Sequence, residues 1–246
     1  MVLKLSLKLT EVSKNGTIIH LGSDGKTQVT VEYKEEKSGK MISIRVQTIL
    51  ISTQHDPELD NETIEKEIKK YFIQAVISPE ILDDKTQYHI NPRGKFIIGG
   101  PEAADAELTE RKIIVDKYRC WRAHGVWAFS GKGPSKVDRS GAYAARWIAK
   151  SLVARGLCDK ALVQITYSIG ITKPLSIFIN TYGTVKPIYS DKKIIEIVEK
   201  NFDLRPGIII RALQLKTPLF AWTVCGGYFS REDLGFPWEV PEKINL

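Results

Sequence analysis

The sequence contains little cysteine, only three residues among 246, and these show neither CxxC spacing nor even pairing. A disulfide framework and a zinc site built from paired thiols are therefore not expected. Free thiols suit a reducing compartment, so the composition favours a cytoplasmic (cytosolic) protein. The three residues are Cys120, Cys158 and Cys225.

Long apolar runs are also missing. The opening stretch, MVLKLSLKL, alternates leucine with polar residues, and no segment approaches the ~20 apolar residues that a membrane-spanning helix requires. We therefore expect no signal peptide and no membrane partner. Hydrophobic residues make up 43% of the chain and charged residues 26%, a composition that supports one large or two modest buried cores.

Acidic residues are scarce in one segment, residues 111–139. It holds eight basic residues against two acidic ones, so most of the formal net charge of +7 is concentrated there. A focus of positive charge attracts a polyanion, either nucleic acid or polyphosphate, although a solvated basic face is the simpler alternative. The basic residues are Arg111, Lys112, Lys117, Arg119, Arg122, Lys132, Lys136 and Arg139.

Two strands joined by a turn are expected in the first part of the chain. Thr27 to Tyr33 and Ile42 to Ser52 are rich in β-branched residues, and the turn between them contains Ser38 and Gly39. The second strand alternates, which predicts a hairpin with one buried face. The residues predicted to share that face are Ile42, Ile44, Val46 and Leu50.

A helix is expected directly after this hairpin. Asp60 is placed to cap its first turn, and apolar residues then recur at helical spacing through Val76. The stripe consists of Ile64, Ile68, Phe72 and Ala75.

The same order of elements returns later in the chain. Strands are expected at 161–167 and 175–182, and a helix is expected to start after a Ser190 cap. The two similar units indicate internal repetition, and each has a sheet with one apolar face to cover. The sequence therefore predicts an α+β architecture, with sheets packed on each other or under helices.

A further helix, from Ser140 to Arg155, is expected between the two units. Asp138 or Ser140 would cap its start, and Gly156 would end it. The residues before it include Gly131 and two lysines, Lys132 and Lys136. The positive end of a helix next to such a loop predicts an anion-binding site.

Several blocks of this sequence resemble those of the methionine adenosyltransferases, also called S-adenosylmethionine synthetases. Eight blocks follow one another in the family's order and span nearly the whole chain, which makes chance similarity very improbable. They are DGKTQVT (24–30), STQHD (52–56), GKFIIGGP (94–101), LTERKIIVDKY (108–118), AFSGKGPSKVDRSGAYAARW (128–147), TYSIG (166–170), FDLRPG (202–207) and FPWEVP (236–241).

The resemblance implies a pseudo-threefold fold made of three similar α+β domains, working as a homodimer with its sites between subunits. On this basis we expect three regions. Residues 1–99 would be a nearly complete first repeat domain, and residues 100–139 the remnant of a truncated central domain that carries the phosphate loop. Residues 140–246 would be the C-terminal repeat domain.

The resemblance also implies an activity. The sulfur of L-methionine would attack C5′ of ATP, and the whole triphosphate would leave and then be hydrolysed. Charge that builds on a departing polyphosphate is stabilised by cations, so Mg²⁺ and K⁺ are the cofactors that the resemblance implies.

Individual residues are assigned roles through the same resemblance. Asp138 would bind Mg²⁺ as well as substrate, and Phe96 would stack on adenine. Further contacts to ATP or the substrate would come from Asp24, Asp105, Ser130 and Ile169. The catalytic cations that hold the triphosphate would be Lys26, Arg111, Lys112, Lys132 and Lys136.

Simpler interpretations stay open for several of these residues. Each lysine taken alone can be an exposed surface cation, Asp138 a helix cap, and Phe96 a core residue. His55 and His124 have no nucleophile or metal-ligand pattern around them, so neither is expected to be catalytic.

The chain also departs from the family pattern. Val126 and Trp127 stand where the family's phosphate loop has glycines, and Glu107 and Glu110 add negative charge nearby. Glycine lets a loop take positive φ and approach phosphate closely, so these replacements oppose tight binding. The family's Gly-His-Pro-Asp-Lys segment, with its essential histidine and a metal-binding aspartate, has no counterpart among these residues.

Three functional hypotheses follow. The first is a working methionine adenosyltransferase. The second is a catalytically inactive, truncated pseudoenzyme that at most binds polyphosphate or pairs with a full-length family member. The third, a nucleic-acid binder, is disfavoured because the sequence contains no recognised nucleic-acid motif.

Overall fold

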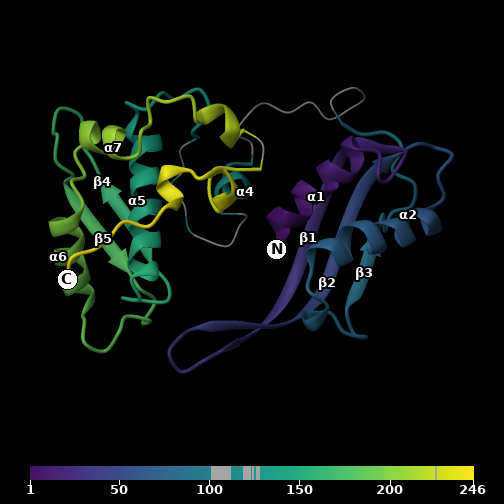
Figure 1. Ribbon diagram of the computed structural model, residues 1–246, viewed down its shortest axis with the longest axis horizontal. Helices are drawn as coiled ribbons and strands as arrows, with labels where there is room; N and C mark the ends of the chain where they lie inside the picture. Colours follow the sequence, from purple (N-terminus) through teal and green to yellow (C-terminus); the bar gives the residue numbers. More distant parts are fainter. Residues whose placement is uncertain (101–111, 119–122, 124, 126–127, 225) are drawn as a thin grey trace. The chain divides into compact units, whose positions relative to one another are not determined.

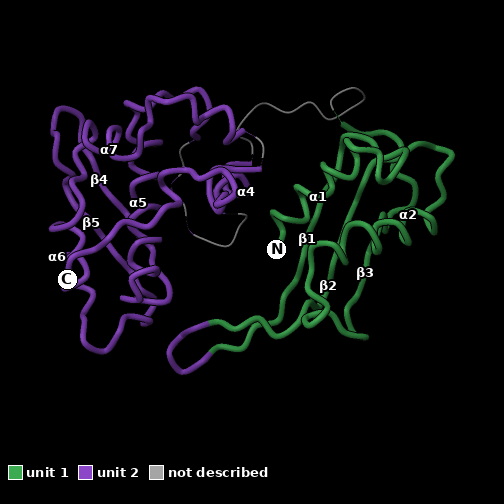
Figure 2. Tube along the Cα trace, in the orientation of Figure 1, with its two compact units in different colours: residues 1–35, 41–108 green, residues 36–40, 109–246 purple. Residues whose placement is uncertain are grey.

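The computed structural model describes residues 1–100, 112–118, 123, 125, 128–224 and 226–246 (Figure 1). The chain divides into two compact units, which are coloured separately in Figure 2. Unit 1 comprises residues 1–35 and 41–108, and unit 2 comprises residues 36–40 and 109–246. The predicted α+β class is confirmed, because each unit combines helices with a small sheet.

Unit 1 is a three-stranded sheet covered by helices. Strands β1 (Leu21–Glu35) and β2 (Met41–His55) pair antiparallel as predicted, and β3 (Gln87–Ile90) adds to β2 in parallel. Helix α1 (Val2–Lys14) was not anticipated from the sequence. It contributes Leu5, Leu9 and Val12 to the same buried cluster as the inward face of β2.

The prediction that Ile42, Ile44, Val46 and Leu50 share one buried face of β2 is wrong, because only Val46 among them is buried. Ile42 and Ile44 are 40% and 44% exposed, whereas Val46 and Ile49 are fully buried. Thr30 pairs with Thr48 but Val31 pairs with Val46, so Gln47 is an extra residue in the ladder. A bulge of this kind shifts the alternation by one residue, and the buried face therefore moves from even-numbered to odd-numbered positions.

The helix after β2 begins as predicted and then changes its winding. The Asp60 carboxylate accepts a hydrogen bond from the Thr63 N–H at 2.9 Å, at the head of α2 (Asn61–Glu67). A π-helical segment, Ile68–Ile73, follows, and then a short α3 (Gln74–Val76). The wider turn rotates the stripe, so Ile73 and Ile77 are buried and Ala75 is exposed, contrary to the prediction.

Unit 2 repeats the pattern of a helix, a hairpin and a second helix. Helix α5 (Val137–Ala154) precedes the antiparallel strands β4 (Leu162–Thr166) and β5 (Ser176–Asn180), and α6 (Asp191–Asn201) follows them. Ser190 caps α6 as predicted, since its hydroxyl accepts from the Lys193 N–H at 3.2 Å. The predicted repetition is thus confirmed, and it includes a helix before each hairpin.

The remaining elements are short. Helices α4 (Ile113–Tyr118) and α7 (Pro206–Ala212) both belong to unit 2. The 3₁₀ turns are Pro79–Ile81, Phe220–Thr223, Glu232–Leu234 and Pro237–Glu239. No helix within the described ranges is both long enough and apolar enough to cross a membrane.

Helix α5 starts earlier than predicted. Its first residue is Val137, and Lys136 is the N-cap residue without a side-chain capping bond, so neither Asp138 nor Ser140 caps the helix. The predicted end is confirmed. Gly156 takes a φ of +72°, and the Leu157 N–H donates to the Leu152 carbonyl at 3.1 Å, which closes the last turn.

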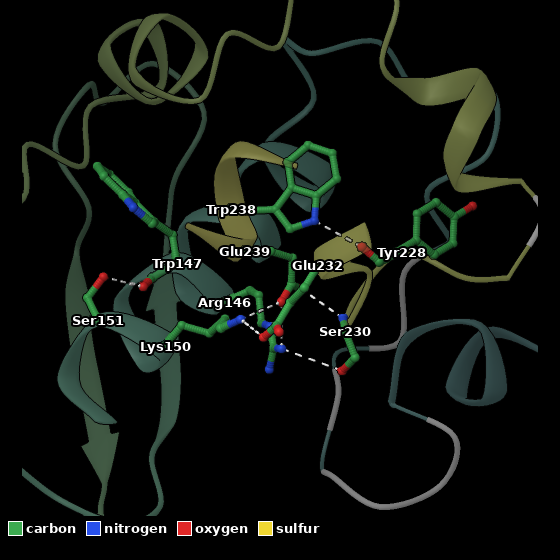
Figure 3. Close-up of polar contacts among 9 residues, drawn as sticks. All are labelled: Arg146, Trp147, Lys150, Ser151, Tyr228, Ser230, Glu232, Trp238 and Glu239. Atoms are coloured by element: carbon green, nitrogen blue, oxygen red, sulfur yellow. Dashed lines mark hydrogen bonds and ion pairs between the residues drawn. The ribbon is translucent and has the colours of Figure 1, made fainter. Parts of the chain in front are cut away.

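A buried ion-pair network fixes the middle of α5 to the C-terminal segment (Figure 3). The Glu239 carboxylate, whose side chain is 1% exposed, accepts from Arg146 at 2.9 Å and from Lys150 at 3.1 Å. It also accepts from the Ser230 backbone N–H at 2.8 Å. Next to it, the Trp238 indole donates to the Tyr228 carbonyl at 2.9 Å. These bonds hold α5 and therefore determine where its N-terminal end lies.

Candidate functional site

The candidate site is the loop that leads into α5, residues 128–136, together with the first turn of that helix. The loop contains two tight turns, closed by Lys132 N–H to Phe129 carbonyl at 3.0 Å and Lys136 N–H to Gly133 carbonyl at 3.2 Å. Gly131 takes a φ of +75°, which a residue with a side chain adopts only with strain. Phe129 is buried and anchors the start of the loop in the core.

Two predicted site residues meet at the head of α5. The Lys132 ammonium lies 2.8 Å from the Asp138 carboxylate, and both side chains are partly exposed, at 27% and 35%. Asp138 lies in the first turn of the helix, where the helix dipole favours a negative charge. The carboxylate thus offsets one of the loop's positive charges, whereas Lys136 is exposed and has no ion-pair partner among the described residues.

The basic segment is less exposed than its composition suggested. Lys117 is only 4% exposed and lies 3.6 Å above the centre of the Phe129 ring, and Arg139 is 4% exposed. These two cations support the core of unit 2, while Lys112 is exposed. Arg111, Arg119 and Arg122 lie outside the described residues.

Ser130 is held by an aromatic residue from the far end of the chain. The Ser130 hydroxyl lies 2.9 Å from the Tyr228 hydroxyl. The Tyr228 ring packs edge-on against the Phe129 ring, with 5.0 Å between their centroids. The tyrosine therefore connects the loop to the segment that Trp238 and Glu239 fix onto α5.

A cavity of about 1150 Å³ opens beside the head of α5. Three predicted site residues line it, namely Lys136, Asp138 and Ile169, and the side chain of Ile169 is fully exposed. The cavity also contains Arg205 and Arg211, which were not predicted. Their signal in the sequence was weak, because they are two isolated arginines within and just after the FDLRPG block.

The balance of charge in the cavity favours an anionic ligand. Arg205 is paired with Asp203 through bonds of 2.9 and 3.0 Å, and Asp138 is paired with Lys132. Lys136 and Arg211 remain without an ion-pair partner among the residues that the structure describes. Tyr167, also on the wall, donates to the Leu204 carbonyl at 2.7 Å, and its burial raises the pKa of its phenol to about 12.

The other described site residues belong to unit 1. The Lys26 side chain is exposed, and the Asp24 carboxylate accepts from the Gly100 N–H at 3.3 Å. Phe96 is half-buried and is not part of the buried apolar cluster. The roles assigned to these three residues remain predictions. Asp105, which was assigned a contact to ATP or the substrate, lies outside the described residues.

His55 has a structural role in unit 1. It is 2% exposed, and its Nε2 accepts from the Phe96 backbone N–H at 3.1 Å. Its Nδ1 therefore carries the proton and donates to the Asp56 carbonyl at 2.8 Å. Both ring nitrogens are thus engaged by backbone groups.

The described residues contain no group of three or more His, Cys, Asp or Glu side chains that could enclose a metal ion. Asp138 therefore offers a single carboxylate. Such a donor fits Mg²⁺, which commonly takes one or two protein carboxylates and completes its coordination with water and phosphate oxygens. The chemistry of the site is compatible with a magnesium ion that arrives with a polyphosphate.

Comparison with known proteins gives two family matches. The model of the S-adenosylmethionine synthetase central domain matches residues 1–96, and that of the C-terminal domain matches residues 98–240. The boundary between them lies close to the one expected at residue 99. The assignment differs from the expectation, however, since residues 1–96 match the central domain rather than the first, and residues 100–139 fall within the C-terminal match.

Curated relatives give the same result. The chain is 56% identical to the S-adenosylmethionine synthase of Clostridium botulinum and 54% identical to that of Clostridium tetani, each over 241 residues. The enzyme of Clostridium acetobutylicum is 52% identical over the same length. In each case the alignment covers 98% of this chain but only 60% of the relative.

Proposed function

Because the chain belongs to the S-adenosylmethionine synthetase family, we propose that it serves S-adenosylmethionine synthesis from ATP and L-methionine by holding the polyphosphate of ATP. The observation that carries this proposal is the head of α5. There Lys136, the Asp138 carboxylate and the positive end of an 18-residue helix lie beside one cavity, and Lys132 is bonded to that carboxylate.

The chemistry assigned to these residues is electrostatic. In the proposed reaction a lone pair on the methionine sulfur forms a bond to C5′, and the C5′–oxygen bond breaks with its electron pair passing to the triphosphate. Cations near the departing group stabilise the charge that develops on it. Lys136 is exposed for this task, and Lys132 can exchange its bond with Asp138 for one to phosphate.

We propose that Asp138 would hold Mg²⁺ together with phosphate oxygens and water. When bound, the ion would neutralise part of the polyphosphate charge. If Lys132 moved from Asp138 to phosphate, the carboxylate oxygen that it now binds, Oδ2, would become available for such contacts. The remaining parts of the proposal rest on family resemblance. We propose K⁺ as a second cofactor, a homodimer as the assembly and the cytoplasm as the location. We also propose that the triphosphate is bound by Arg111, Lys112 and Lys26.

A second proposal is that the chain by itself binds polyphosphate without catalysis, or pairs with a full-length relative. The observation that favours it is the extent of the match, because the chain spans about 60% of the curated relatives. Groups that act together in catalysis cannot be removed singly without losing most of the rate.

One assay separates the two proposals. The purified chain is incubated with ATP, methionine, Mg²⁺ and K⁺, and S-adenosylmethionine is measured by mass spectrometry beside a full-length family member. We expect no product from the chain alone. Product formed by the isolated chain would refute the inactive interpretation, and light scattering on the same sample tests whether the chain self-associates.

Val126 and Trp127, which stand where the family's phosphate loop has glycines, lie outside the described residues. Their predicted effect on phosphate binding therefore stays a prediction. Replacing both by glycine is expected to strengthen triphosphate binding, since it restores backbone freedom and removes an indole. A folded double variant that binds no better would show that the steric interpretation is wrong.

A further inference from the structure

Arg139 is a buried cation that has no carboxylate partner among the described residues. Its side chain is 4% exposed, and its guanidinium carbon lies 3.5 Å above the centre of the Phe220 ring. Its Nε donates to the Tyr143 hydroxyl at 2.9 Å, and an Nη donates to the Thr223 hydroxyl at 3.4 Å. A buried charge is costly unless hydrogen bonds satisfy it, so these contacts hold the guanidinium in one orientation.

The remaining donor of Arg139 bonds to the loop at the candidate site. One Nη donates to the Lys132 carbonyl at 2.7 Å and to the Phe129 carbonyl at 3.2 Å. Both carbonyls belong to the loop that leads into α5. The Arg139 side chain, which is held by Phe220 and Tyr143, therefore binds two carbonyl groups of this loop and orients them toward the core.

The pull on these carbonyls determines where the neighbouring amides point. The described peptide bonds are trans, and in a trans peptide the N–H points opposite to the C=O. The N–H groups of Ser130 and Gly133 are therefore directed away from Arg139. Within the described part of the chain neither N–H group has a hydrogen-bond partner. Between them Gly131 has positive φ, the conformation found in loops whose successive amides bind anions.

We propose that Arg139 is a positioning residue, which keeps the loop open so that the Ser130 and Gly133 amides face the polyphosphate. This inference rests on the proposed function, because it assigns the shape of the same phosphate site. Arg139 itself does not touch the ligand. It acts through the two carbonyls, and its fork of N–H donors is the property that matters, not its charge alone.

The test compares three variants in triphosphate binding by calorimetry at low salt. Arg139→Lys keeps the charge but loses the fork, and we expect its affinity to fall about tenfold, the equivalent of one or two hydrogen bonds. Arg231→Lys is the matched control, because Arg231 is 6% exposed in the same unit and bonds to Asp233. We expect its affinity to equal that of the parent. Lys136→Ala reports on the proposed function itself.

A spectroscopic measurement separates positioning from general stability. Triphosphate should shift the amide resonances of Ser130 and Gly133 in the parent chain, and these shifts should be much smaller in Arg139→Lys at saturating ligand. Tyr143→Phe, which removes one anchor of the guanidinium, should show a smaller loss of affinity, about two- to threefold. This variant serves the same purpose if Arg139→Lys fails to fold.

The outcomes are distinct. If the parent binds triphosphate and Lys136→Ala weakens it, but Arg139→Lys and Tyr143→Phe bind like the parent, the positioning role is refuted and the phosphate site stands. If the parent does not bind, or Lys136→Ala binds unchanged, the proposed function fails and the positioning role fails with it.

Discussion

The two units share a helix, a hairpin and a second helix, but the first turns of α1 and α5, the helices that precede the two hairpins, differ in charge. Helix α1 begins with Val2 and has no acidic residue in its first turn. Helix α5 follows a glycine-containing loop with Lys132 and Lys136 and carries Asp138 in its first turn. The comparison teaches that the repeated scaffold does not by itself specify the candidate site, and that the charged residues at the head of α5 are needed as well.

The units also differ in how they are stabilised. Unit 1 has a long hairpin whose core is mainly aliphatic, with Ile49, Ile51 and Ile68 fully buried. Unit 2 has strands of five residues and a core rich in aromatic rings, in which Tyr143 stacks on Trp238 at 4.0 Å. A short sheet buries little surface by itself, so packing and ion pairs around α5 must supply more of the stability.

The largest effect is expected in unit 1, where positions along β2 differ strongly in burial. Ile49→Ala should lower the free energy of unfolding by about 4 kcal/mol, since it removes a fully buried side chain. Ile44→Ala, at a site 44% exposed, should cost less than about 1 kcal/mol. Urea unfolding measures both. Equal costs would contradict the burial of Ile49 and the exposure of Ile44.

The second effect tests the anchoring of α5 in unit 2. Glu239→Ala leaves Arg146 and Lys150 without their buried partner, which should cost about 3 kcal/mol. Glu232→Ala, which removes a 77% exposed partner of Lys150, should cost less than about 1 kcal/mol. Hydrogen exchange should show the loss for Glu239→Ala in unit 2 and leave the protection of unit 1 unchanged. A loss spread equally over both units would contradict separate cores.

The third effect is a loss of stability in alkali that arises in unit 2. Burial raises the pKa of the Tyr143 phenol from 10.0 to about 12, so the folded state keeps its proton while the unfolded state ionises. The contribution of Tyr143 to the free energy of unfolding is therefore fully present below pH 10. It is lost as the pH rises toward 12, and the loss reaches up to about 2 kcal/mol.

Tyr143→Phe provides the control for this pH dependence. The variant should be less sensitive to pH between 10 and 12, although it also loses the bond from Arg139. Tyr167, whose pKa is also raised to about 12 by burial, should preserve part of the dependence. Thermal unfolding at several pH values measures the slope. A slope that is the same in the parent and in Tyr143→Phe would refute the assignment.

The smallest effects are expected at the N-caps of α2 and α6, which occupy equivalent positions in the two units. Asp60→Ala and Ser190→Ala each remove a side-chain acceptor at the head of the helix after a hairpin, and each should cost about 1 kcal/mol. Asp60→Asn and Ser190→Thr, which keep an acceptor, should cost much less. Chemical denaturation distinguishes these pairs, and a loss confined to one unit would show that the caps are not equivalent.

Local patterns predicted much of this fold because they depend on neighbours in the sequence. The Asp60 and Ser190 caps and the Gly156 stop all involve residues within a few positions of one another. The bulge at Gln47 and the π-helical turn at Ile68–Ile73 were not predicted, because each depends on pairing or packing with distant residues. Helix α1 was missed although Leu5, Leu9 and Val12 have helical spacing.

The site was predicted only in part for a similar reason. The motif blocks placed Lys132, Lys136 and Asp138 together, and the structure brings them to the head of α5. The burial of Lys117 and Arg139 could not be derived from the charge of the segment, since it depends on rings from residues 129 and 220. Composition counts charges, but the fold decides which of them face the solvent.

The most direct test of the central claim is triphosphate binding at the head of α5, measured by calorimetry at low salt. Lys136→Ala should weaken binding several-fold, and Lys132→Ala should weaken it further because it also leaves the Asp138 carboxylate unpaired beside the phosphate. Lys200→Ala, an exposed lysine in α6, should bind like the parent, and added salt should weaken binding by every variant. Parent-like affinity in both Lys136→Ala and Lys132→Ala would contradict the assignment of this loop as the phosphate site.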